Sequence, residues 1–194
     1  MLEAPGTVSG DAFGSSVAIS GTTAVVGAGV AGRAYVFTKA AEVWRQVAKL
    51  NGSDTRLSDE FGSSVAISGT TVVVGAQYHA NHAGRAYVFA KSAAGWHQVA
   101  ELKDSDNTGT DEFGYSVAIS GAIVVVGAPY HTSAGRAYVF IKTAKGWKQA
   151  AELRGSDNLA HDNYFGSSVA VSGSTALVGA PDHAKAGRAY LFEA

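Results

Sequence analysis

The sequence predicts an all-β protein assembled from four copies of one four-stranded unit, and three observations support this prediction. The dipeptide Phe-Gly returns about every 50 residues, and a Gly-Arg-Ala-Tyr segment follows each one, so the chain repeats itself four times. Hydrophobic residues make up 46% of the 194 residues, while 24 glycines and only 3 prolines supply the turns. Helical periodicity is nowhere sustained. Repeats of this length that are rich in strand formers are typical of propeller blades, here about 11–58, 59–110, 111–162 and 163–194 of one domain, 1–194.

The first two strands of each repeat are predicted from small and apolar residues. Residues 61–68 read FGSSVAIS, in which small residues alternate with larger ones. Small side chains allow neighbouring strands to approach closely, which suits the innermost strand of a blade. A Ser-Gly turn then leads through a tight hairpin to a short apolar strand at 72–74, expected to be buried on both faces.

The third and fourth strands follow in the same repeat. Residues 85–91 alternate aromatic and small side chains, and residues 96–102 begin with Trp and mix polar with apolar residues, as an outer edge strand does. The fourth strand recurs at 44–50 and 147–153 but is absent after the last third strand, which gives 15 strands in all. Residues 1–10 look like the end of an outer strand and its loop.

Two short motifs carry a family resemblance. Phe-Gly near the start of the first strand and Gly-Ala-Pro after the second, as in Gly127-Ala128-Pro129 and Gly179-Ala180-Pro181, resemble the FG-GAP repeat. That repeat forms the blades of the integrin α-subunit propeller and of many bacterial surface or secreted proteins. The resemblance covers nearly the whole chain. It implies a β-propeller at the cell surface or outside the cell, with ligands on the face that carries the 2–3 and 4–1 loops.

The resemblance does not extend to the calcium site of integrin-type repeats. Those repeats carry an aspartate-rich loop between the first two strands, whereas the loop here is Ser68-Gly69 and one or two further residues. Calcium needs about six to eight oxygen ligands from a loop long enough to wrap it. We therefore expect no calcium in the 1–2 hairpins.

Composition excludes several partners and chemistries. The formal net charge of −1 gives no field that attracts nucleic acid. No apolar run approaches transmembrane length, so no membrane insertion is expected, and the start MLEAPGTVSGD has no signal-peptide pattern. The absence of cysteine excludes disulfides and thiolate chemistry. No catalytic set of residues, no cofactor and no metal site is predicted.

The 2–3 loops differ between repeats and supply the candidate ligand residues. Aromatic and His side chains near Asp suit the binding of a sugar or a peptide, although variable loops are also simply tolerant surface. The pair His79-x-x-His82 has a spacing seen in zinc sites but occurs once and lacks a nearby Glu. The candidate ligand-binding residues are Tyr78, His79, His82, Tyr130, His131, Asp182 and His183.

Arginines and aspartates recur at fixed places and are expected to be structural. An Arg begins every third strand, and an Arg–Asp ion pair is a simpler account of it than an anion site. Aspartates of the 4–1 loops suit turn chemistry, with an acidic rim for a metal or a cationic partner as the alternative. The residues assigned to structural roles are Arg33, Arg85, Arg136, Arg188, Asp11, Asp59 and Asp111.

Three functions remain open at this point: a non-enzymatic binding or adhesion module with a protein partner, a lectin-like glycan binder, or a structural propeller fragment without a ligand. Closure is a separate question, because both terminal repeats keep apolar faces that must be covered. Four blades would have to close on themselves, or two chains would have to share one eight-bladed ring. The Val- and Ala-rich strands favour the homodimer.

Overall fold

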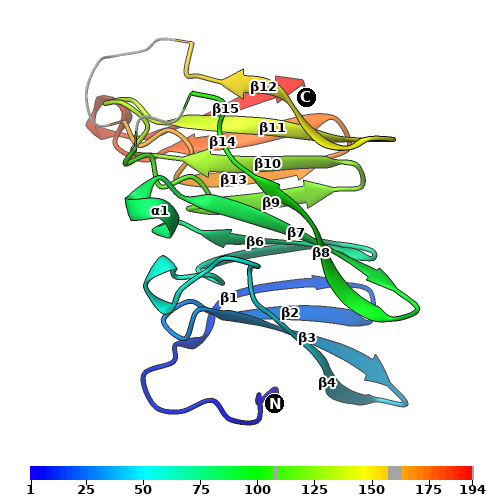
Figure 1. Cartoon of the computed structure of the whole chain (residues 1–194). Helices are drawn as coiled ribbons and strands as arrows, with labels where there is room; N and C mark the ends of the chain where they lie inside the picture. The colour runs from blue at the N-terminus through cyan, green and yellow to red at the C-terminus, as the bar shows by residue number, and fades with distance from the viewer. Residues whose placement is uncertain (107–108, 157–162, 194) are drawn as a thin grey trace.

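The computed structural model describes residues 1–106, 109–156 and 163–193, and it is built almost entirely of β-strands (Figure 1). Four antiparallel sheets lie side by side in chain order, and each corresponds to one repeat, which confirms the predicted propeller-type architecture. We call the sheets blades 1 to 4. Blades 1 to 3 have four strands in sequential order, and blade 4 has three.

The described part of the chain contains the 15 predicted strands and three short helical turns. Blade 1 holds β1 (Phe13–Ser20), β2 (Thr23–Ala28), β3 (Arg33–Ala40) and β4 (Val43–Leu50). Blade 2 holds β5 (Ser64–Ser68), β6 (Thr71–Ala76), β7 (Arg85–Ser92) and β8 (Gly95–Leu102). Blade 3 holds β9 (Ser116–Ser120), β10 (Ile123–Ala128), β11 (Arg136–Thr143) and β12 (Gly146–Leu153). Blade 4 holds β13 (Ser168–Ser172), β14 (Thr175–Ala180) and β15 (Arg188–Glu193). The helical turns are η1 (Leu57–Asp59), α1 (His79–His82) and η2 (His183–Lys185). Within the described ranges, no helix is long and apolar enough to cross a membrane.

The 1–2 hairpins are tight, as the Ser-Gly turns predict. In blade 1, Ser20 pairs directly with Thr23, so the connection is only two residues long. Gly21 has a φ of +56°, which a residue with a side chain rarely adopts. The same turn geometry recurs in the other three blades. A loop this short cannot wrap a calcium ion.

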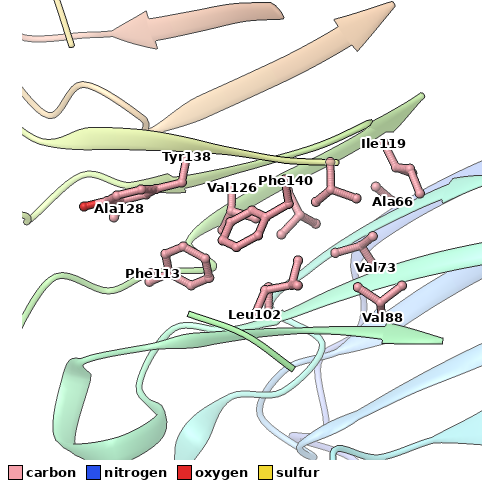
Figure 2. Packing of buried hydrophobic residues seen from close by; sticks show 13 residues of the cluster. Ala66, Val73, Val88, Leu102, Phe113, Ile119, Val126, Ala128, Tyr138 and Phe140 are labelled. Atoms are coloured by element: carbon pink, nitrogen blue, oxygen red, sulfur yellow. The ribbon is translucent and has the colours of Figure 1, made fainter. Parts of the chain in front are cut away.

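The Phe-Gly motif is explained by packing between blades. Phe113, at the start of blade 3, is fully buried with Tyr138 and Phe140 of its own blade and Leu102 of blade 2 (Figure 2). Its ring centroid lies 5.6 Å from that of Tyr138 and 5.9 Å from that of Phe140. Burying such a side chain contributes about 1.5–3 kcal/mol, so in blades 2 to 4 the motif phenylalanine anchors the blade to the previous one.

The glycine of Phe-Gly allows the backbones of adjacent blades to touch. A Cβ atom on Gly75 of β6 would lie 2.0 Å from the carbonyl oxygen of Gly114 in the next blade. That carbonyl accepts a hydrogen bond from Ser64 Oγ at 2.7 Å. Gly114 itself has a φ of +93°. Both glycines and the serine are therefore fixed by this close approach.

The four blades form an open array. The innermost strands contact one another in chain order, β1 with β5, β5 with β9 and β9 with β13. The outer half of the free face of blade 1 is covered by Leu2 and Ala4, which pack with Phe13 and Tyr35. The inner half of that face and the free face of blade 4 are exposed.

Candidate functional site

The 2–3 and 4–1 loops meet at one edge of the array, the left edge in Figure 1, which we call the loop face. Antiparallel strands alternate in direction, so every second connection of a blade returns to the same edge. The loop face is formed by residues 29–32, 51–63, 77–84, 103–106, 109–115, 129–135, 163–167 and 181–187.

In blade 2 a partly buried histidine, His79, connects the two loops. The Nδ1 atom of His79 lies 3.0 Å from a carboxylate oxygen of Asp59, and its Nε2 atom lies 3.5 Å from Asp54. The hydroxyl of Tyr87 donates to Asp54 at 2.8 Å. Burial first, and then this hydrogen bond, raise the pKa of Tyr87. The polar atoms of these four side chains bond mainly to one another, so the network can hold the two loops in position.

Blade 3 repeats the arrangement. The Nδ1 atom of His131 lies 3.1 Å from Asp111, its Nε2 atom lies 3.5 Å from Asp106, and the hydroxyl of Tyr138 donates to Asp106 at 2.9 Å. Both His131 and Asp111 are buried. Repetition of the whole group in a second blade favours a structural role for it.

Blade 4 keeps the centre of the same group. His183 is buried, and its Nδ1 atom lies 3.4 Å from the hydroxyl of Tyr190. Asp157, the equivalent of Asp106, lies outside the described residues, whereas the buried Asn163 stands where the previous repeat has Asp111. Asp182 is exposed. The structure thus directs three of the candidate ligand residues inward and leaves four at or near the surface. The inward ones are His79, His131 and His183; the outer ones are Tyr78, His82, Tyr130 and Asp182.

The expected pairing of strand-three arginines with aspartates is corrected by the structure. The Nε atom of Arg85 donates to Glu101 at 2.9 Å, and that of Arg136 donates to Glu152 at 2.7 Å. Each glutamate lies on the adjacent outer strand, within reach of the arginine, whereas Asp59 turns inward to histidine. In blades 2 and 3 the arginine thus joins the third strand to the fourth.

The end repeats show what this pairing depends on. Blade 1 has Lys49 where blades 2 and 3 have glutamate, and within the described chain Arg33 forms no ion pair. Arg188 begins β15, which has no outer strand beside it in the described structure. Asp11, expected as an arginine partner, instead accepts a hydrogen bond from the backbone N–H of Val8 at 2.8 Å, a contact typical of turns.

A polar cavity of about 520 Å³ opens on the loop face of blade 2. Tyr78 and His82 stand at its rim, with their ring centroids 4.5 Å apart. Residues Ala80, Asn81 and His82 all have positive φ, at 52°, 60° and 70°. Backbone of this kind costs free energy and persists only where surrounding contacts fix it, often at binding sites. The cavity is lined by Asp54, Arg56, Ser58, Asp59, Tyr78, His79, Ala80, Asn81 and His82.

Next to the cavity, tyrosines from successive blades form a row that is exposed at Tyr115 and Tyr130 and partly exposed at Tyr78 and Tyr164. The ring of Tyr130 lies 6.3 Å from that of Tyr115 and 5.3 Å from that of Tyr164. Burial, and then the negative charge of Glu112, raise the pKa of both Tyr130 and Tyr78, which places this carboxylate among the rings. We call Tyr78, Tyr115, Tyr130 and Tyr164, with Glu60 and Glu112, the tyrosine–glutamate row.

Only Tyr78 and Tyr130 of this row were predicted from the sequence, and its other two tyrosines and both glutamates were missed. Tyr115 stands where the other repeats have Ser15, Ser63 and Ser167, so a comparison of equivalent positions could have revealed it. Tyr164 likewise stands in the position that Glu112 occupies in the previous repeat. Both departures from the repeat lie at the start of a blade, beside the variable 2–3 loops and not within them.

Within the described ranges, one group brings three metal-ligating side chains together. Asp104, Asp106 and His131 have ligand atoms within 4.8 Å of one another. Asp104 occupies the place of Gly52 in the previous repeat. The pair His79-x-x-His82 does not belong to a group of this kind, because the ring of His79 is turned toward Asp59.

Comparison with known proteins agrees with this architecture. The family model described as FG-GAP repeat matches residues 1–37, 44–89, 96–140 and 147–192, which together make up most of the chain. No curated protein matches the chain. The matched segments contain the Phe-Gly turns and the strands whose packing was described above. The chain therefore belongs to the FG-GAP repeat family.

Proposed function

We propose that this chain is a non-enzymatic, adhesion-type binding module whose loop face binds a protein partner. The observation that supports it most is the tyrosine–glutamate row beside the polar cavity of blade 2. Exposed, clustered tyrosines are typical of protein-binding surfaces, because they offer a large contact area and lose little conformational entropy. FG-GAP repeats are generally found in adhesion-type propellers, which points the same way.

The chemistry of the row favours a partner segment with a basic side chain. Tyrosine rings attract a guanidinium or ammonium group through their faces, and Glu60 and Glu112 add negative charge beside them. Glu60 is held by Gln77, whose Nε2 atom donates to it at 2.8 Å. A partner arginine would stack on Tyr130 and approach Glu112, while neighbouring residues enter the cavity.

A selection of displayed random peptides on the immobilised chain tests the proposal. We expect enrichment of peptides with Arg or Lys next to an aromatic residue. An enriched peptide, measured by calorimetry, should lose about tenfold or more in affinity to Tyr130→Ala and to Glu112→Gln. Val99→Ala is the matched control, because Val99 is exposed on the outer strand β8 and lies outside the row. Peptides that bind Tyr130→Ala as well as they bind the original chain would refute the proposal.

A glycan is the second candidate, because the same exposed rings suit stacking on a sugar face. A glycan array probed with the chain and with Tyr130→Ala separates the two candidates. Sugar binding that disappears in the variant, together with a peptide selection that yields nothing, would replace the protein partner by a glycan. Melting curves of each variant show whether it remains folded.

A further inference from the structure

We propose that a second copy of this chain completes the propeller, with blade 1 of each copy seated on blade 4 of the other. The two free faces of the array are complementary to one another in the same way as the faces inside it. The inference concerns assembly and does not depend on what the loop face binds.

Each interface between adjacent blades is built from one set of contacts. A serine of the innermost strand donates to the carbonyl of the glycine in the next Phe-Gly, and the Oγ–O distances are 2.8, 2.7 and 2.7 Å. A serine at the end of that strand accepts from the N–H of the next hairpin glycine, at 3.1 Å in all three cases. The donor serines are Ser16, Ser64 and Ser116, and the acceptor serines are Ser20, Ser68 and Ser120.

Blade 4 carries one unmatched half of this interface. Ser168 and Ser172 stand in the positions of the donor and acceptor serines, and both are exposed. Leu177 and Leu191 are 41% and 71% exposed, whereas Val25 and Val36, their equivalents in blade 1, are completely buried against blade 2. Leaving two leucines in water forfeits hydrophobic free energy that each interior interface gains.

Blade 1 carries the other half. Val17 and Ile19 are 70% and 66% exposed, whereas Val117 and Ile119, their equivalents in blade 3, are each 9% exposed. Gly14 presents the Phe-Gly turn with open space around it, since nothing lies within 4 Å of the position of a Cβ atom. Inside the array, a blade packs its apolar innermost strand and its Phe-Gly turn against the preceding blade. The free face of blade 1 presents the same strand and turn to solvent.

A cavity in blade 4 has the position of the missing turn. It measures about 130 Å³ and is lined by Ser168, Leu177 and Gly179, among others. At Gly27, Gly75 and Gly127 the equivalent space is filled by a carbonyl of the next blade, 2.1, 2.0 and 1.9 Å from an ideal Cβ position. At Gly179 only atoms of Ser168 lie nearby. The turn at Gly14 of a second copy fits this space.

The chain does not cover these faces by itself, because the residues on both remain exposed in the described structure. In two copies related by a twofold axis, blade 1 of each copy would cover blade 4 of the other, so all four free faces would be buried. The contact is head-to-tail, and the symmetry makes it occur twice, so the assembly closes instead of growing into a filament.

Light scattering of the whole chain is the first test. We expect a mass of twice 19.8 kDa at micromolar concentration. A mass of 19.8 kDa, or a mass of three or more chains, would overturn the two-copy ring.

Mixing two single variants tests the head-to-tail geometry. Leu177 takes the place of Val25, and Val17 takes the place of Val65, which share one buried cluster in the first interior interface. Val17→Asp and Leu177→Lys should each be monomeric alone, because each buries an unpaired charge in both interfaces of its own dimer. In a mixture, Asp meets Lys at one interface and the original residues meet at the other, so the dimer mass should return.

Two further variants distinguish a lost dimer interface from a folding defect. Val47→Asp introduces the same charge at a valine that is 52% exposed on β4, away from the free face, and should stay dimeric. Gly179→Ala adds one methyl group where only a rotatable serine side chain is near, so the chain should fold, yet the methyl group blocks the turn of the second copy. A dimeric Gly179→Ala, or a monomeric Val47→Asp with native circular dichroism, would contradict the assigned interface.

Discussion

One carboxylate oxygen of Asp59 lies 3.0 Å from Nδ1 of His79 and also accepts the backbone N–H of Arg56 at 2.8 Å. It therefore joins the 2–3 loop of blade 2 to the 4–1 loop that precedes the blade. We expect Asp59→Ala to lower the free energy of unfolding by about 1–3 kcal/mol, because a partly buried imidazole and a backbone N–H lose their partner. Urea titration measures the loss. Asp11→Ala is the control, since Asp11 has the turn contact without a histidine, and an equal loss there would contradict the role given to His79.

The two arginine–glutamate pairs should differ in strength. The side chain of Glu152 is 21% exposed and that of Glu101 is 36% exposed. We expect Arg136→Ala to lower the free energy of unfolding by about 1–3 kcal/mol, because Arg136 is the more buried arginine and also donates to the carbonyl of Gly135, although Glu152 keeps Arg154 as a second partner at 2.8 Å. Arg85→Ala should cost about 1 kcal/mol or less. Double-mutant cycles with Glu152→Gln and Glu101→Gln measure the coupling, and a stronger Arg85 pair would show that burial does not decide it.

The close approach of backbones predicts a glycine that cannot be replaced. Gly75→Ala places a methyl group against the carbonyl oxygen of Gly114. Since backbone cannot rotate away as a side chain does, we expect a loss of about 1–3 kcal/mol or more in the free energy of unfolding. Gly179→Ala, measured at a concentration low enough to keep the chain monomeric, is the matched control and should retain its stability. Equal melting temperatures for the two variants would argue against contact between the blades at Gly75.

Tyrosine ionisation should limit stability in alkaline solution. The pKa of Tyr87 is raised in the folded chain, so above about pH 10 the unfolded chain releases a proton that the folded chain retains. The stabilisation is fully present below the ordinary tyrosine pKa of 10.0 and is lost as the pH rises beyond it. Tyr87→Phe should therefore flatten the decline of the unfolding free energy between pH 10 and pH 11, as measured by denaturant titration.

Tyr35→Phe serves as the reference for that experiment. Tyr35 is the equivalent residue of blade 1 and is buried, but its loop has no histidine, and within the described chain its hydroxyl donates to no carboxylate. If Tyr87→Phe and Tyr35→Phe change the pH dependence equally, the hydrogen bond to Asp54 is not responsible for it.

The strands could be predicted from the sequence because their causes are local. Alternation, Ser-Gly turns and recurrence each constrain a few neighbouring residues, so the edges of β7 and β8 fall within one residue of the expected positions. The start of the first strand was less well predicted. It was expected at Phe61 in blade 2, but β5 begins at Ser64, because Phe61 and Gly62 pack against blade 1 and leave the strand.

Side-chain partners were harder to predict because they depend on packing between segments far apart in the sequence. The arginines were expected to pair with aspartates, yet whether Arg85 meets Asp59 or Glu101 depends on which residues face each other across β7 and β8. The loop histidines presented the same ambiguity. Only the fold shows that His131 points at Asp111 instead of into solvent.

The uniformity of the serine–glycine contacts has a consequence for how the chain reaches its native state. The serine and glycine groups that join blade 2 to blade 3 are the same as those that join blade 3 to blade 4. A misfolded arrangement in which blade 2 packs directly on blade 4 would therefore form the same hydrogen bonds. Neighbours along the chain meet first because the loop to be closed is shorter. Correct order is thus a matter of kinetics, and the 4–1 connections of 13 or 14 residues, more than any single contact, keep the blades in sequence.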